Sequence, residues 1–160
     1  MFSPFDFVYF CRYLSHYLSQ KLTFIESSEN YPIAILKGIP EEAPDIKIEF
    51  VHYKTEKEAA EKWYERSKRI NYDNLYIIFT GAGFTDEHFR MMEAVQCNNK
   101  VLLSSIKETD ISWAHTIKST QKHGYNYLFF NALGLRYYER KWNFVEFLNT
   151  KPGTVSARQD

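Results

Sequence analysis

Apolar residues recur at intervals of three and four between positions 3 and 19, which is the spacing of one face of an α-helix. Ser3 and Pro4 suit its start, because serine can accept from unpaired amides and proline has no amide to leave unpaired. Asp6 lies in the first turn, where the helix dipole favours negative charge. We therefore expect a helix over this segment, with Cys11 as a buried structural thiol.

Three short segments with strand-like patterns follow, at 22–26, 31–36 and 46–53. In the third segment apolar residues alternate with polar ones, which is typical of a strand with one buried face. Pro40 and Pro44 interrupt the connector that precedes it, so this connector is expected to be a loop. The second and third segments are therefore predicted to form a hairpin.

A second helix is predicted to begin at Thr55, which can cap it while Glu58 completes a capping box. Ala59 and Ala60 are small, so this face of the helix can approach a sheet closely. The charged residues are interpreted as a solvated face stabilised by pairs four residues apart. These pairs are Glu58 with Lys62 and Glu65 with Arg69.

The run at 75–80 is almost continuously apolar, as in a strand covered on both faces. A further helix is predicted to start at Thr85, and the segment 101–105 repeats the buried-strand pattern. The strands at 46–53, 75–80 and 101–105 alternate with helices, and this pattern indicates a parallel or mixed sheet in which 46–53 and 75–80 run side by side. The sequence thus predicts an α/β fold with a Rossmann-like layered arrangement, in which helices flank a mixed or mostly parallel sheet.

Length and composition bound the organisation of the chain. Its 160 residues fit one hydrophobic core, and the aromatic content of 18% favours a folded chain. A single α/β domain is predicted over 1–150. The last segment, 151–160, has little to bury and is expected to be a flexible tail.

Charge and cysteine use exclude several function classes. Twenty Lys and Arg balance twenty Asp and Glu, so no overall field exists to attract nucleic acid. The two cysteines and the scattered histidines show no metal-ligand spacing, and no metal site is predicted. No eighteen apolar residues run together and the N-terminus lacks a basic leader, so a cytoplasmic protein without a membrane span is expected.

In open α/β sheets, ligands bind beyond the carboxyl ends of the strands, which makes the end of segment 46–53 a candidate site. His52 and Lys54 are the predicted catalytic residues, since an imidazole can act as acid or base and a lysine can clamp an anion. The alternative for His52 is a packed, hydrogen-bonded side chain, because strand alternation places it on the same face as Phe50.

The loop after the strand at 75–80 is the second candidate. Gly81, Gly83 and Thr85 are the predicted cofactor-binding residues, because glycines let backbone amides approach an anion at a helix N-terminus. The loop matches neither a dinucleotide-binding fingerprint nor a P-loop, so the cofactor is unknown at this stage. A plain tight turn is the alternative.

The segment 48–80 contains a strand that ends in His-Tyr-Lys, a helix with the pattern EA..KW..R..RI, and a strand that starts with Asn-Leu. The residues of this pattern are His52, Tyr53, Lys54, Glu58, Ala59, Lys62, Trp63, Arg66, Arg69, Ile70, Asn74 and Leu75. In this pattern the chain resembles a bacterial family known as domain of unknown function 1919. Looser similarity extends over most of the chain.

Proteins of this family are often found among capsule and exopolysaccharide biosynthesis genes, and some are described as transferases. The resemblance therefore implies a transferase that acts on a sugar donor or acceptor, with a sugar or sugar nucleotide as its ligand. The family usually has an upstream strand and a segment rich in Asn, Cys, Trp and Gly, which this chain is expected to lack. Its loop at 81–85 also departs from the family, where this loop is more acidic.

The competing hypothesis is a non-catalytic binding or assembly module. Tyr137, Tyr138 and Trp142 lie in a predicted closing helix, and their aromatic side chains can stack on a glycan or a partner protein. An exposed aromatic surface would favour this module. A concave pocket that holds His52 and Lys54 would favour the enzyme.

Overall fold

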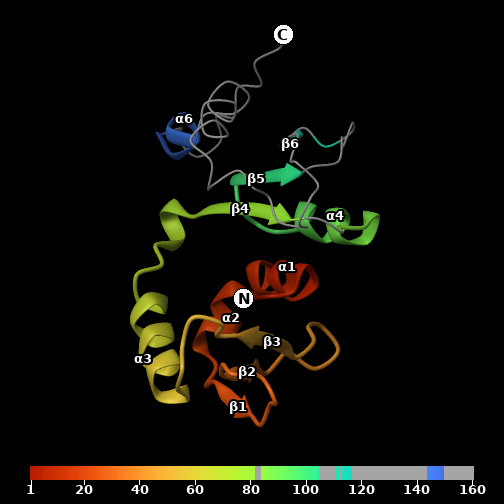
Figure 1. Cartoon of the computed structure of the whole chain (residues 1–160). Coiled ribbons are helices and arrows are strands. Elements are labelled where there is room, and N and C mark those ends of the chain that lie inside the picture. The colour runs from red at the N-terminus through yellow and green to blue at the C-terminus, as the bar shows by residue number, and fades with distance from the viewer. Residues whose placement is uncertain (82–83, 105–110, 112, 117–143, 150–160) are drawn as a thin grey trace. The chain divides into compact units, whose positions relative to one another are not determined.

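The computed structural model describes residues 1–81, 84–104, 111, 113–116 and 144–149 (Figure 1). The chain divides into two compact units, one formed by residues 1–71 and 85–96, the other by residues 72–84 and those from 97 onward. The single domain expected over 1–150 stays a prediction, and the expected tail at 151–160 lies outside the described residues.

The predicted N-terminal helix is present as two consecutive helices, α1 (Pro4–Arg12) and α2 (Leu14–Ser19). The Ser3 hydroxyl accepts a hydrogen bond from the Asp6 amide at 3.1 Å, which confirms the predicted cap. Between the helices, Tyr13 departs from helical geometry with φ −116° and ψ 40°. The three- and four-residue spacing of apolar residues does not reveal this break.

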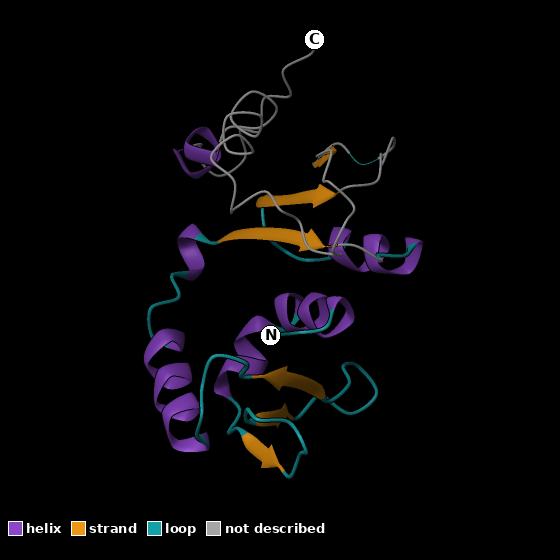
Figure 2. Cartoon of the chain, viewed as in Figure 1, coloured by secondary structure: helices purple, strands orange, loops and turns teal. Residues whose placement is uncertain are grey.

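Three short strands follow and form an antiparallel sheet in the order β1-β2-β3 (Figure 2). They are β1 (Thr23–Ile25), β2 (Ile33–Leu36) and β3 (Ile46–Glu49). Ala34 of β2 lies opposite Ile48 of β3, so the predicted hairpin is confirmed. The strand expected to reach residue 53 stops at Glu49.

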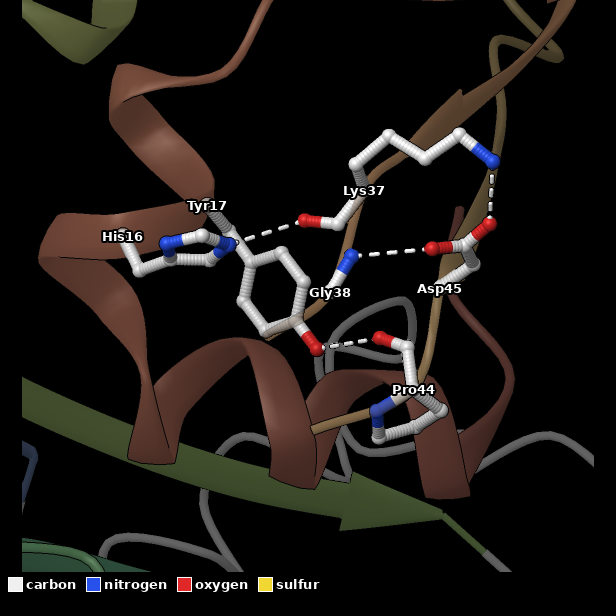
Figure 3. Close-up of polar contacts among 6 residues, drawn as sticks. All are labelled: His16, Tyr17, Lys37, Gly38, Pro44 and Asp45. Atoms are coloured by element: carbon white, nitrogen blue, oxygen red, sulfur yellow. Dashed lines mark hydrogen bonds and ion pairs between the residues drawn. The ribbon is translucent and has the colours of Figure 1, made fainter. Parts of the chain in front are cut away.

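The loop between β2 and β3 is fixed by polar contacts to α2 and within itself (Figure 3). The hydroxyl of Tyr17 donates to the Pro44 carbonyl at 2.6 Å, and an imidazole nitrogen of His16 lies 2.9 Å from the Lys37 carbonyl. The Asp45 carboxylate accepts from the Lys37 ammonium at 2.6 Å and from a backbone amide at 2.9 Å. That amide belongs to Gly38.

Helix α3 (Glu56–Ser67) begins where the sequence predicts, with the Thr55 hydroxyl accepting from the Glu58 amide at 3.2 Å. Of the two predicted charge pairs, Glu65 with Arg69 is observed. The other differs, because Lys62 lies 2.8 Å from Glu65. Glu65 therefore forms ion pairs with both Lys62 and Arg69.

The core of the first unit joins the antiparallel sheet to α2 and α3. Its buried residues are Tyr17, Leu22, Ala34, Leu36, Ala43, Ile46, Ile48, Phe50 and Ala59. Small Ala59 of α3 is fully buried in this core. Cys11 is buried as well, as expected.

Helix α4 (Asp86–Glu93) also belongs to the first unit. Thr85 and His88 form a capping box, in which the Thr85 amide donates to His88 Nδ1 at 3.1 Å. The ring centroids of His88 and Phe5 lie 5.8 Å apart in an edge-on arrangement. The predicted start of this helix is therefore confirmed, and its neighbour in the unit is α1.

The second unit contains a parallel sheet in the order β4-β5-β6. Its elements are a 3₁₀ turn (Tyr72–Asn74), β4 (Tyr76–Gly81), β5 (Asn99–Ser104), β6 (Ala114–Thr116) and α6 (Phe144–Asn149). Ile78 of β4 lies opposite Val101 of β5, and both pack near Phe147 of α6. Ile77 and Phe79 on the other face of β4 are buried too, as the apolar run predicts.

The α/β class is confirmed, and the strands expected at 75–80 and 101–105 are paired in parallel as β4 and β5. The predicted parallel pairing of 46–53 with 75–80 is wrong. β3 belongs to the antiparallel sheet and β4 to the parallel one, in the other unit. A hairpin with the neighbouring β2 closes a short loop, whereas pairing with β4 would close a longer one at a higher entropic cost. The Rossmann-like layered arrangement is not confirmed.

Candidate functional site

A pocket of about 220 Å³ lies within the first unit. It is formed by the first residues of the chain, by β3 with the turn that follows, and by α3. The lining residues are Met1, Phe2, Ile48, Glu49, Phe50, Val51, His52, Tyr53, Lys62, Trp63 and Arg66. Three segments far apart in sequence therefore meet around one space.

The local backbone explains how His52 reaches this pocket. β3 ends at Glu49, and the Tyr53 amide donates to the Phe50 carbonyl at 2.9 Å, which closes a tight turn. His52 lies in that turn instead of on a strand, and its side chain is exposed. The prediction of a packed strand-end histidine is therefore wrong, because the alternation it relied on stops at Glu49.

Backbone hydrogen bonds in both directions join Met1 to Glu49. The Glu49 amide donates to the Met1 carbonyl at 2.9 Å, and the Met1 amino group donates to the Glu49 carbonyl. Burial lowers the pKa of this amino group, while the charge of Glu49 acts in the opposite direction. The start of the chain is thus held as one side of the pocket.

An aromatic wall lines the pocket between β3 and α3. The ring of Phe50 meets those of Tyr53 and Trp63 edge-on, with centroid distances of 6.0 and 6.3 Å. Trp63 also lies 5.9 Å from Phe10 of α1. Its indole N–H is buried and has no hydrogen-bond acceptor among the described residues. Packing against other rings therefore holds the orientation of the indole.

Some charged residues of the pocket form an ion pair within the protein, and one does not. Glu49 lies 2.9 Å from Lys47, and Lys62 lies 2.8 Å from Glu65, so both already have a partner of opposite charge. For the guanidinium of Arg66, the described part of the chain provides no such partner. Arg66 follows Lys62 by four residues and therefore lies on the same face of α3. The pocket thus keeps an uncompensated positive charge.

The two predicted catalytic residues separate in the structure. His52 lines the pocket, whereas Lys54 is exposed and is not one of the lining residues. Both were chosen because a strand was expected to carry them to the edge of a parallel sheet. That strand ends before either residue, so only the position of His52 fits a binding site.

The three residues of the predicted cofactor loop have different structural positions. Gly81 is the last residue of β4, Gly83 lies outside the described residues, and Thr85 is the cap of α4. The Thr85 hydroxyl lies 2.7 Å from His88 Nδ1 and has a local structural role. Because β3 and β4 lie in different sheets, the sheet-edge argument no longer joins this loop to His52. Its role in cofactor binding stays a prediction.

Sequence reasoning did not assign Glu49, Lys62, Trp63 or Arg66 to the pocket. The charges on α3 were interpreted as a solvated face and Trp63 as part of its packed face. Positions 62, 63 and 66 occupy adjacent places on one helical surface, and this spacing was the available signal. This spacing indicates a binding surface only when the turn with His52 is known to line the same pocket.

Cys97 is the second free cysteine and has a backbone hydrogen-bond partner. The half-buried thiol of Cys97 donates to the Leu75 carbonyl at 3.3 Å, and burial raises the pKa of this thiol. Over the described residues, His, Cys, Asp and Glu side chains form no group of three or more that could hold a metal ion. Nor does any helix in the described ranges have the length and apolar content needed to cross a bilayer.

Comparison with known proteins places this chain in a family. The profile of the family Domain of unknown function (DUF1919) matches residues 1–149. The chain is also similar to an uncharacterized protein of Haemophilus influenzae (strain Rd), with 31% identity over 151 residues. That match covers 92% of this chain and 69% of the Haemophilus protein. The chain therefore belongs to the DUF1919 family.

Proposed function

We propose that this protein is a transferase of exopolysaccharide or capsule biosynthesis and that the pocket beside α3 binds its sugar donor or acceptor. The observation that carries the proposal is the position of the residues behind the family resemblance. Five of them line this one pocket, namely His52, Tyr53, Lys62, Trp63 and Arg66. The biosynthetic context comes from the resemblance alone.

The composition of the pocket supports a small polar ligand. Sites for small molecules are usually concave and mostly apolar, with a few polar groups that orient the ligand. Here Phe50, Tyr53 and Trp63 offer aromatic surface to the apolar face of a sugar ring. His52 and Arg66 supply the polar groups. A sugar ring combines both kinds of surface and fits this lining.

His52 is the residue proposed to move a proton. In a transfer reaction its imidazole takes the proton of the acceptor hydroxyl while that oxygen forms a bond to the transferred group. The bond between this group and the leaving group breaks, and the electron pair departs with the leaving group. The proton on the imidazole can then pass to the leaving group or to water. Such a group contributes roughly 10²–10⁴-fold to the rate.

A thermal-shift panel of nucleotide sugars, sugar phosphates and acyl donors tests the proposal. A ligand at 100 times its Kd adds about 2.7 kcal/mol of stability, or a rise in Tm of about 5–10 °C. His52→Ala should keep the shift and lose roughly 10²–10⁴-fold in turnover. Lys54→Ala is the matched control, because Lys54 is exposed nearby but does not line the pocket.

Two results would contradict the proposal. The first is a folded protein whose Tm does not move with any compound of the panel. The second is loss of turnover in Lys54→Ala but not in His52→Ala, which would restore the sequence-based role of Lys54 and remove His52 from the chemistry.

The second candidate is a binding or assembly module without catalysis. It is favoured by the surroundings of His52, because no carboxylate among the described residues bonds to its imidazole and orients it. Ligand binding without turnover in the wild type would support this candidate. The aromatic surface expected at Tyr137, Tyr138 and Trp142 lies outside the described residues.

A further inference from the structure

We infer that the pocket beside α3 selects a monosaccharide that carries a negatively charged group, either a phosphate or a carboxylate. This inference rests on the proposed function and narrows it to a substrate class. The negative group would meet Arg66, and the sugar ring would lie against the aromatic wall of Phe50, Tyr53 and Trp63.

The size of the pocket sets the first limit. Its volume of about 220 Å³ is below the roughly 300–1,000 Å³ of pockets that enclose drug-sized ligands. A single sugar ring with one substituent is of suitable size. A complete nucleotide sugar would leave its base and ribose outside the pocket, so the selected part of any such ligand is the sugar with its charged group.

The charge balance sets the second limit. The carboxylate of Glu49 is the acidic group in the lining, and its ion pair with Lys47 at 2.9 Å reduces its repulsion of an anion. Lys62 is engaged by Glu65 and the Met1 amino group donates to the Glu49 carbonyl, which leaves the guanidinium of Arg66 as the lining cation without a partner among the described residues. A neutral sugar has no negative group to pair with the guanidinium of Arg66.

The geometry of α3 sets the third limit. Arg66 follows Trp63 by three residues, so both side chains start from one face of the helix, and both line the pocket. A guanidinium presents a planar pair of N–H donors that matches the two oxygens of a carboxylate or phosphate. A ligand that uses both residues must therefore carry its anionic group close to an apolar ring face.

The experiment is isothermal titration calorimetry on the full chain with matched ligands. Glucose and galactose are each compared with their 1-phosphates and their uronic acids, and inorganic phosphate is titrated alone. At least one charged derivative should bind about ten- to hundredfold more tightly than its neutral parent, the range expected for a charge-assisted bidentate contact. The phosphate and carboxylate arms identify which anion is preferred.

Arg66→Ala tests the residue assigned to the anion. The variant should bind the charged and neutral ligands with similar Kd, while Arg66→Lys should keep part of the preference. Arg69→Ala is the matched control, because Arg69 is exposed just beyond the end of α3, is paired with Glu65 and does not line the pocket. It should bind like the wild type.

The outcomes separate this inference from the proposed function. Equal binding of neutral and charged sugars, unaffected by Arg66→Ala, would overturn the charge selection while leaving a sugar-binding pocket. Inorganic phosphate as tight as the sugar phosphates would overturn the role of the sugar ring. Binding of nucleotide sugars with no binding of any monosaccharide would overturn the inference alone. No binding of any sugar compound would overturn both.

Discussion

Tyr17 shows how one buried residue fixes a loop that has no regular structure. Its side chain is fully buried, and its hydroxyl donates to the Pro44 carbonyl at 2.6 Å (Figure 3). Burial raises the pKa of Tyr17 to about 12, with further contributions from the charges of Tyr9 and Asp45. The folded state therefore favours the protonated phenol.

This preference predicts a pH dependence for the free energy of unfolding. The pKa of Tyr17 in the folded chain, about 12, exceeds the ordinary value of 10.0, so its contribution is complete below pH 10 and is lost towards pH 12. Tyr17→Phe should cost about 1 kcal/mol at neutral pH through the lost hydrogen bond. Its stability should then fall less steeply than that of the wild type between pH 10 and pH 12.

Urea denaturation at several pH values measures both quantities. The other tyrosines titrate in both proteins, so the difference between wild type and variant isolates Tyr17. Parallel stability curves above pH 10 would contradict the assigned environment of this hydroxyl.

At the scale of elements, two positions in the loop between β2 and β3 limit which residues can occupy them, namely Gly38 and Glu41. A Cβ on Gly38 would lie 2.0 Å from the Ala43 carbonyl oxygen and 2.4 Å from that of Pro44. Glu41 has a φ of 64°, in the left-handed region that favours glycine. The first position therefore requires glycine, and the second would accept it.

A pair of substitutions tests this assignment. Gly38→Ala should destabilise the protein by about 1–3 kcal/mol, because rigid backbone atoms must move to admit the methyl group. Glu41→Gly should be neutral or stabilising within about 1 kcal/mol, since relief of the left-handed strain offsets the greater freedom of glycine when unfolded. Chemical denaturation measures both changes. A reversed order of stability would show that the loop has a different conformation.

Sequence reasoning succeeded for elements where the determining contacts are local. Ser3, Thr55 and Thr85 each cap the helix predicted from them, because a cap bonds to an amide three residues away. The hairpin of β2 and β3 was also predictable from the intervening prolines. The parallel pairing of β4 with β5 agrees with the β-α-β pattern of the sequence, but the placement of β3 beside β4 does not hold. Alternation and apolar runs do not specify which strands pair across a long connection.

At the scale of the whole molecule, the pocket could not be predicted because it joins residues 1–2, 48–53 and 62–66. His52 was identified for its chemistry, although the strand argument used to place it is wrong. Lys54 was assigned by the same argument and lies outside the lining. Arg66 and Trp63 gain a functional interpretation only when α3 is seen beside the turn at His52.

The most direct test of the central claim, that the pocket beside α3 binds a charged sugar, is a titration followed by ¹H–¹⁵N NMR. The chain has three tryptophans, at 63, 113 and 142, and each gives an indole N–H signal. The signal lost in Trp63→Phe identifies the one that belongs to the pocket. On addition of a sugar phosphate or uronic acid that binds in calorimetry, this signal should move and saturate in the wild type, and in Arg66→Ala it should need about a ten- to hundredfold higher ligand concentration to do so. A bound charged sugar that shifts the signal of Trp113 or Trp142 while leaving that of Trp63 unchanged would contradict the account.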